Sequence, residues 1–235
     1  MSADPQPLAF YGTRLGAVAA RLLRARIAAL WPEMSGRAVL GIGHAAPYLR
    51  LWRDDAARCI AAVPATLPAA RWPTGVASRT VVVEEELLPL PDLAFDCVLL
   101  VHGLETAGNA RRLLREVWRV LRDDGRLLVV APNRRGLWAH AESTPFGQGH
   151  PYSSGQLTRL LAATMFEVER RDEALHAPPL RWRAALRSAG AAERIGRRVL
   201  PGLGGVTLAE ARKNMYAAVP LEAVAVRRSV VSEAA

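Results

Sequence analysis

Short apolar runs alternate with amphipathic stretches along most of this chain. Phe95–Val101 and Arg126–Ala131 are too short to span a membrane and have the length of strands that are buried on both faces. Between these runs, apolar side chains recur with the spacing of one stripe of a helix, at Leu113, Leu114, Val117, Trp118 and Leu121. The segment therefore predicts a strand, a helix and a second strand, which is the unit that builds parallel sheets.

The same alternation predicts elements on both sides of this unit. Upstream, we expect a helix over Thr13–Leu30, a strand over Arg37–Gly43, a short helix over Tyr48–Arg53, and strands over Cys59–Val63 and Arg79–Glu84. Downstream, we expect a long connection over Pro132–Tyr152, a helix over Ser154–Ala163, a strand over Phe166–Arg170, a basic helical stretch over Leu180–Leu200 with a break near Gly190, and a last strand over Gly205–Arg212. This order predicts an α/β fold in layers.

The length of 235 residues fits one domain with a full hydrophobic core. Because 51% of the residues are hydrophobic and 23% are charged, we expect a globular chain. We predict one domain over residues 1–220, with an N-terminal helix at 12–31, a core at 37–171, a helical insertion at 177–202 and a final strand region at 205–219. A tail at 221–235 has no predicted structure.

The two cysteines and the N-terminus predict a location for the chain. Cys97 lies inside an apolar run and Cys59 at the edge of another, so we expect two buried thiols in a reducing compartment. Met1–Pro7 lacks the basic and apolar pattern of a secretory signal. No run approaches the about 20 apolar residues of a spanning helix. We therefore expect a cytoplasmic protein with no membrane span.

The formal net charge of +9 comes almost entirely from arginine, since Lys213 is the only lysine. Arginine and alanine in place of lysine are typical of a G+C-rich coding bias. The arginines are also scattered, whereas a nucleic-acid surface clusters them with aromatic residues. A small molecule is therefore the expected partner, nucleic acid is supported by charge alone, and the oligomeric state stays open.

Four motifs, in the same order and spacing, resemble the class I S-adenosylmethionine-dependent methyltransferases. They lie in the part of the chain from about Gly36 to Arg171 and are Leu88–Asp92 with Phe95–Val98, His102–Glu105, Leu113–Arg122 with Asp124 and Gly125, and Tyr152–Ser153 with Leu157, Leu161 and Phe166. The resemblance implies a three-layer sandwich around a mostly parallel seven-stranded sheet whose last strand is antiparallel, the Rossmann-like methyltransferase fold. Most of these positions are packing and turn positions, so they indicate fold more directly than activity.

The resemblance also implies S-adenosylmethionine as the cofactor. The predicted cofactor-binding residues are Gly41, Gly43, His44, Ala45, Glu84, Glu85 and His102. In the family, Gly43 matches the first glycine of a turn that approaches the ligand closely, and Glu84 matches an acidic residue placed against the adenine amino group. If Gly43 serves this approach, Gly43→Val abolishes cofactor binding in a protein that still folds.

The glycine turn departs from the family pattern. Gly41 stands where the family has an acidic residue, and Ala45 and Pro47 stand where it has glycines. The strand that ends at Val63 and Pro64 lacks the carboxylate that holds the ribose hydroxyls in the family. The sequence therefore predicts a cofactor that is bound more weakly than in the family, or lost.

No catalytic residue can be assigned from the sequence. His44 and His102 each have a packing role and a general-base role as alternatives. His140, Glu142 and His150 match no compact metal motif, so we predict no metal. The aromatic side chains of the long connection, Trp138, Phe146 and Tyr152, are interpreted either as a substrate lid or as packing over the sheet.

Two functions follow from these observations. The first is an S-adenosylmethionine-dependent methyltransferase that acts on an unidentified, small acceptor. The alternative is a catalytically inactive methyltransferase-like module with a binding or regulatory role, which the altered glycine turn and the missing ribose carboxylate favour.

Overall fold

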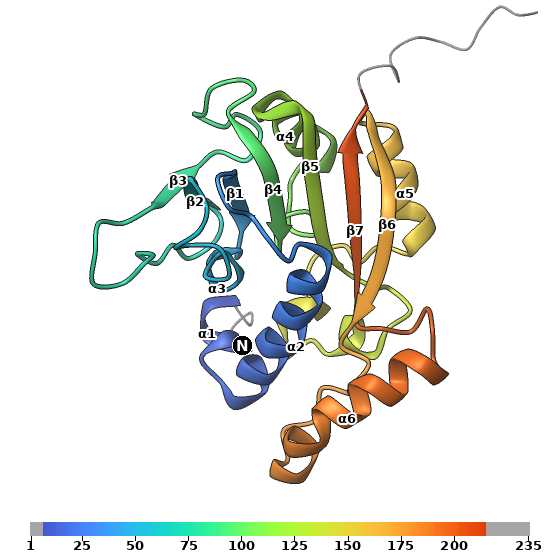
Figure 1. Cartoon of the computed structure of the whole chain (residues 1–235). Helices are drawn as coiled ribbons and strands as arrows, with labels where there is room; N and C mark the ends of the chain where they lie inside the picture. Colours follow the sequence, from blue (N-terminus) through green and yellow to red (C-terminus); the bar gives the residue numbers. More distant parts are fainter. Residues whose placement is uncertain (1–6, 215–235) are drawn as a thin grey trace, which may run out of the picture.

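A sheet of seven strands runs through the molecule in the order β3-β2-β1-β4-β5-β7-β6 (Figure 1). The computed structural model describes residues 7–214. The strands are β1 (Ala38–Gly43), β2 (Arg58–Pro64), β3 (Thr80–Val83), β4 (Phe95–Val101), β5 (Leu121–Pro132), β6 (Phe166–Ala174) and β7 (Val206–Lys213). Strands β3, β2, β1, β4 and β5 pair in parallel, whereas β7 is antiparallel to both of its neighbours. The predicted fold class is confirmed.

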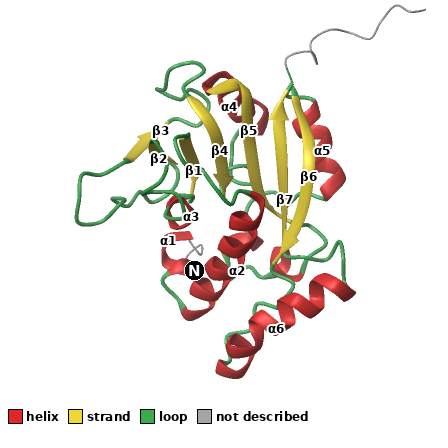
Figure 2. Ribbon diagram, viewed as in Figure 1, coloured by secondary structure: helices red, strands yellow, loops and turns green. Residues whose placement is uncertain are grey.

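Helices cover both faces of the sheet (Figure 2). The helices are α1 (Pro7–Tyr11), α2 (Arg14–Leu30), α3 (Ala46–Leu49), α4 (Ala110–Val120), α5 (Ser154–Ala162) and α6 (Arg183–Val199), with two 3-10 turns, η1 (Leu137–His140) and η2 (Pro145–Gly147). One core cluster joins α2 and α3 to the sheet, and a second joins α4 and α5 to its other face. Helix α6 contacts α2 and β6 at the edge of the first layer.

Strand β4 shows why its apolar run is continuous. Cys97, Leu99 and Val101 belong to the cluster under α2, and Val98 and Leu100 belong to the cluster under α4. All five side chains are buried. Because side chains alternate between the faces of a strand, a strand covered on both sides needs apolar residues at every position.

Two predicted helices differ from the structure. Helix α3 is a single turn over Ala46–Leu49, because the chain leaves it in further turns before β2. The predicted break near Gly190 is wrong, since α6 is continuous over Arg183–Val199. A hypothetical Cβ at Gly190 would meet nothing within 4 Å, so this glycine serves no turn or close approach. A glycine inside a helix costs about 1 kcal/mol relative to alanine, which a 17-residue helix packed on β6 tolerates.

The connection from β2 to β3 contains no helix. Parallel neighbouring strands are usually joined by a helical crossover, but residues 65–79 form turns and irregular chain only. The backbone N–H of Trp72 donates to Thr80 Oγ1 at 3.0 Å, and the N–H of Arg79 donates to the carbonyl oxygen of Trp72 at 2.6 Å. These bonds fix Trp72 next to the start of β3.

Several other expectations concern the chain as a whole. Cys59 and Cys97 are both free and buried, as predicted, and burial raises their pKa to about 11 and about 12, respectively. Within residues 7–214, no helix has both the length and the apolar character needed to cross a membrane. The predicted tail at 221–235 lies outside the described residues.

Glu193 fastens α6 to the end of β6. Its carboxylate accepts the backbone N–H groups of Leu175, His176 and Ala177 at 2.8, 2.7 and 3.1 Å. The side chain is almost fully buried. These three residues lie outside helices and strands, and their N–H groups have no backbone partner within residues 7–214. The Glu193 carboxylate supplies the acceptors that they need.

Glu193→Ala is expected to lower the free energy of unfolding by about 2–4 kcal/mol, because it leaves backbone N–H groups unpaired in a buried place. Arg194→Ala, on the exposed side of the same helix, is the control and is expected to change stability by less than about 0.5 kcal/mol. Urea unfolding measures both. Equal effects of the two variants would contradict the anchoring role of Glu193.

Candidate functional site

The turn after β1 is locked against the end of β4. Gly43 has a φ of +81°, and a Cβ at this position would lie 2.2 Å from the carbonyl oxygen of Val101. The backbone N–H of His44 donates to that same oxygen at 2.7 Å. Glycine is therefore required here by the neighbouring strand. Gly43→Val is expected to strain the fold as well as the site, because the added side chain would collide with backbone.

Gly41 serves the packing of α3 on β1. A Cβ on Gly41 would lie 2.7 Å from the Cβ of Ala45 and 2.7 Å from a methyl group of Leu49. Ala45 is itself buried. The position where the family has an acidic residue is thus filled by the short helix, which leaves no room for a carboxylate. Gly41 and Ala45 do not line the cavity described below.

A chain of buried hydrogen bonds covers the carboxyl ends of β1 and β4. Tyr48 donates its hydroxyl proton to the Tyr11 hydroxyl at 2.9 Å, and the Tyr11 hydroxyl lies 2.8 Å from His102 Nε2. His102 Nδ1 lies 2.9 Å from a carboxylate oxygen of Glu105. This pattern suits a neutral imidazole that carries its proton on Nδ1. Both His102 and Glu105 are buried, the ring is held on both sides, and neither residue lines the cavity described below.

His44 stacks on Tyr11 beside this chain of bonds. The two ring centroids are 4.9 Å apart and the ring planes differ by 7°. Burial, with a smaller contribution from His102, lowers the pKa of His44 to about 3, so the ring is neutral at pH 7. Its Nε2 is buried and has no hydrogen-bond partner within residues 7–214. His44 thus offers one unpaired, uncharged nitrogen next to the cavity.

The run of glutamates after β3 fixes the chain to the start of α4. Glu85 accepts the backbone N–H of Gly108 at 2.7 Å, and Glu86 forms an ion pair with Arg112 at 2.7 Å. Glu84 is exposed and forms a backbone bridge with Leu87. Neither Glu84 nor Glu85 lines the cavity, and their role as cofactor ligands stays a prediction.

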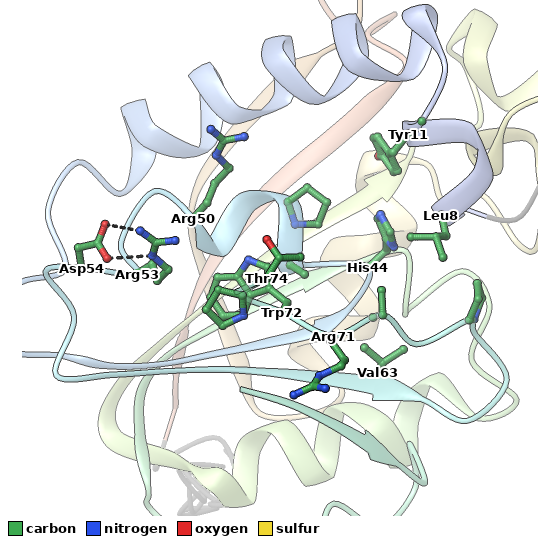
Figure 3. A pocket seen from close by; sticks show the side chains of 17 residues that line it. Leu8, Tyr11, His44, Arg50, Arg53, Asp54, Val63, Arg71, Trp72 and Thr74 are labelled. Atoms are coloured by element: carbon green, nitrogen blue, oxygen red, sulfur yellow. Dashed lines mark hydrogen bonds and ion pairs between the residues drawn. The ribbon is translucent and has the colours of Figure 1, made fainter. Parts of the chain in front are cut away.

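A cavity of about 700 Å³ opens between the turn after β1, helix α3 and the connection from β2 to β3 (Figure 3). This volume lies within the range of about 300–1,000 Å³ that is usual for small-molecule sites. At one end the cavity is apolar and aromatic, with Leu8, Tyr11, His44 and Val63. The other end carries the charged side chains Arg50, Arg53 and Asp54, and Arg71 lies between the two ends. Of the seven predicted cofactor-binding residues, only Gly43 and His44 line it.

Asp54 lies in the turns between α3 and β2, ahead of the strand end where the family has its ribose carboxylate. In the structure it is the carboxylate at the rim of the cavity, and Arg53 binds both of its oxygens at 2.8 and 2.9 Å. The connection 65–79, for which the sequence predicts no helix or strand, supplies one wall of the site. No pattern of residue types marks such a wall, because its place depends on how the loop folds back.

The aromatic residues of the long connection pack into the core. Trp138 and Phe146 are buried against Phe10, and Trp138 Nε1 donates to the carbonyl oxygen of Ala177 at 2.8 Å. This favours packing over a substrate lid for these two side chains. Within the described residues, no group of three His, Cys, Asp or Glu side chains is placed to hold a metal ion.

Known structures share this architecture. An S-adenosylmethionine-dependent methyltransferase from Thermotoga maritima superimposes with a TM-score of 0.62 at 18% identity, covering 85% of this chain and 92% of its own. The 1,6-didemethyltoxoflavin-N1-methyltransferase of Burkholderia thailandensis, solved with bound 1,6-didemethyltoxoflavin and S-adenosylhomocysteine, superimposes with a TM-score of 0.55 at 17% identity, covering 83% of this chain and 78% of that one. The chain thus has the Rossmann-like fold of the class I S-adenosylmethionine-dependent methyltransferases.

The family match is narrower than the structural one. Residues 40–129 match the family model described as "Methyltransferase domain". The ubiquinone/menaquinone biosynthesis C-methyltransferase UbiE of Hahella chejuensis is 51% identical over 45 residues, which are 19% of this chain and 18% of that protein. The chain therefore spans less than a fifth of the length of the curated relatives that it matches.

The buried, neutral His44 predicts a loss of stability in acid. Because the folded pKa of about 3 lies below the ordinary value of 6.5, the unfolded chain binds the proton first as the pH falls. The contribution of His44 is present above pH 6.5 and is lost between pH 6.5 and 3. By pH 5 this amounts to about 2 kcal/mol of unfolding free energy.

His44→Phe keeps an aromatic ring on Tyr11 and removes the titrating group. Urea unfolding of both proteins at pH 7.5 and pH 5 tests the prediction, since other histidines titrate equally in the two. We expect the wild-type protein to lose about 2 kcal/mol more than the variant. Parallel losses in both proteins would show that His44 is not buried in a neutral form.

Proposed function

We propose that this protein is an S-adenosylmethionine-dependent methyltransferase that acts on a small-molecule acceptor. The observation that carries the proposal is the cavity of about 700 Å³ that begins at Gly43 and Val63, at the carboxyl ends of β1 and β2. Ligands of open α/β sheets bind outside these strand ends. The match of residues 40–129 to the methyltransferase-domain family supports the same reading.

The aromatic end of the cavity suits an adenosyl ligand. His44 presents a neutral ring and a buried nitrogen without a partner, and an uncharged donor or acceptor can pair with a polar ligand atom there. Tyr11 and Leu8, from the first helix and its end, line this part of the site and limit its access to water. When bound, S-adenosylmethionine supplies an electrophilic methyl group, which the acceptor takes with a lone pair as S-adenosylhomocysteine leaves.

The missing ribose carboxylate predicts weak binding. Among the residues that line the cavity, Asp54 is the carboxylate, and it is already paired with Arg53. Hydrogen bonds to a charged group contribute about 1.5–3 kcal/mol each. Their loss would move a micromolar dissociation constant to roughly 100 μM. We therefore infer that the cofactor is bound, with reduced affinity.

The cavity offers no strong base. His44 has a pKa of about 3, and burial raises the pKa of Tyr11 well above 10. Both nitrogens of His102 are engaged, and the ring does not line the cavity. The residues of the site can therefore bind, orient and exclude water, but they cannot deprotonate a poorly ionised nucleophile. The acceptor atom must have its lone pair available without such help.

The alternative is a binding module that holds a ligand without methyl transfer. The buried hydrogen bonds from Tyr48 through Tyr11 and His102 to Glu105 favour it, because they cover the carboxyl ends of β1 and β4.

We propose a reducing, cytoplasmic setting for the protein under either function, because both cysteines are free and buried.

Val63→Asp tests the location of the ribose. Val63 lines the cavity at the end of β2, where the family carries its ribose carboxylate. We expect at least tenfold tighter binding of S-adenosylmethionine in calorimetric titration, because one or two hydrogen bonds to a charged group are restored. Val63→Asn has nearly the same shape without the charge and should leave the affinity within about threefold.

The wild-type titration decides between the two functions. Heat release or a thermal shift with S-adenosylmethionine at up to millimolar concentration supports the methyltransferase. No response of the wild-type protein and of a folded Val63→Asp variant would contradict cofactor binding and leave the binding module. Circular dichroism and the melting temperature verify that each variant folds.

A further inference from the structure

The charged part of the cavity lies beside the crossover from β2 to β3, which has no helix. Residues 65–79 fold back toward the start of β3, where Trp72 is held by Thr80 and Arg79. The open groove lies between this loop and α3. The groove is a property of this loop and adjoins the glycine turn.

The groove carries more positive than negative charge. Its lining includes three arginines, Arg50, Arg53 and Arg71, and a single carboxylate, Asp54. This carboxylate pairs with Arg53. Figure 3 shows Arg50 and Arg71 on opposite sides of the site, with Trp72 between them. Within residues 7–214, the guanidinium groups of Arg50 and Arg71 have no hydrogen bond and no ion pair.

A further arginine lies close to Arg50. The pKa of Arg24, on α2, is lowered by burial and then by the positive charge of Arg50. Arg24 Nε is buried without a hydrogen-bond partner within the described residues. Arg24 and Arg50 carry like charges that repel each other. An anion that binds to either of them would reduce this repulsion.

The walls of the groove are flat and apolar. Trp72 is half-buried and offers a ring, and Pro47, Pro68 and Pro73 line the same cavity. An apolar wall beside a few charged groups is the usual composition of a site for a small organic ligand. Guanidinium groups bind carboxylate and phosphate oxygens through paired N–H donors.

We propose that this groove binds the anionic group, carboxylate or phosphate, of a small organic molecule whose apolar body lies against Trp72. That this molecule is the methyl acceptor rests on the function proposed above. Where the anionic group is itself the atom that takes the methyl group, its lone pair is available without a base, which agrees with the lack of a base in the cavity. A cationic or neutral acceptor would leave Arg50 and Arg71 without partners.

The test uses benzoate and pyrophosphate as probes for the two anionic groups, and benzamide as the neutral analogue of benzoate. Each is titrated into the full-length protein at constant ionic strength, with sodium chloride as the reference, and read by tryptophan fluorescence and melting temperature. We expect saturable binding of at least one anion and no binding of benzamide. Trp72→Phe should remove most of the fluorescence change.

The double variant R50Q/R71Q is expected to raise the dissociation constant of the bound anion at least tenfold. The matched control R111Q/R115Q removes the same charge from exposed positions on α4, on the other face of the sheet, and should change it less than twofold. Equal weakening in both double variants, or no anion binding beyond the effect of sodium chloride, would overturn the proposal.

Titration with S-adenosylmethionine separates this inference from the proposed function. Anion binding that depends on Arg50 and Arg71, without cofactor binding, supports the groove and overturns the methyltransferase. Cofactor binding without any anion effect overturns the groove alone. Preference for pyrophosphate over benzoate assigns the site to a phosphate group, and the reverse assigns it to a carboxylate.

Discussion

The contact of the turn after β1 with the end of β4 determines where a ligand can bind. His44 donates its N–H to the carbonyl oxygen of Val101, and Gly43 lies too close to that oxygen for any side chain. Tyr11 then covers the turn by stacking on His44 and bonding to His102. These contacts cover the carboxyl ends of β1 and β4. The cavity therefore lies beside them, between the end of β2, helix α3 and the loop 65–79.

The fold could be predicted because its evidence is local and periodic. The run Phe95–Val101 and the helix stripe around Val117 each report burial directly, and the same residues form the two core clusters. The order of elements then leaves few topologies open. Helix α1 was missed because five residues, PLAFY, carry too short a pattern to show a period.

The site was less predictable, and Gly43 and Glu85 show why. Gly43 was expected to make room for a ligand, yet the structure shows that the neighbouring strand already requires a glycine. Glu85 was predicted to bind the cofactor beside Glu84, and in the structure its carboxylate accepts the N–H of Gly108. A motif gives residue types and spacing, but several contacts demand the same type. Arg71 and Asp54 reach the cavity through loops whose course no pattern encodes.

The charges of the cavity constrain the ligands more than its shape does. S-adenosylmethionine carries a sulfonium, so a cavity with three arginines and one paired carboxylate does not by itself attract it. The aromatic end, with a neutral His44, is the part of the site where a cation is not repelled at short range. An anion between Arg50 and Arg71 would offset their charge and make the whole cavity more favourable for a sulfonium. Cofactor and acceptor would then bind cooperatively, and the empty groove would add to the weak affinity for the cofactor that the missing ribose carboxylate already predicts.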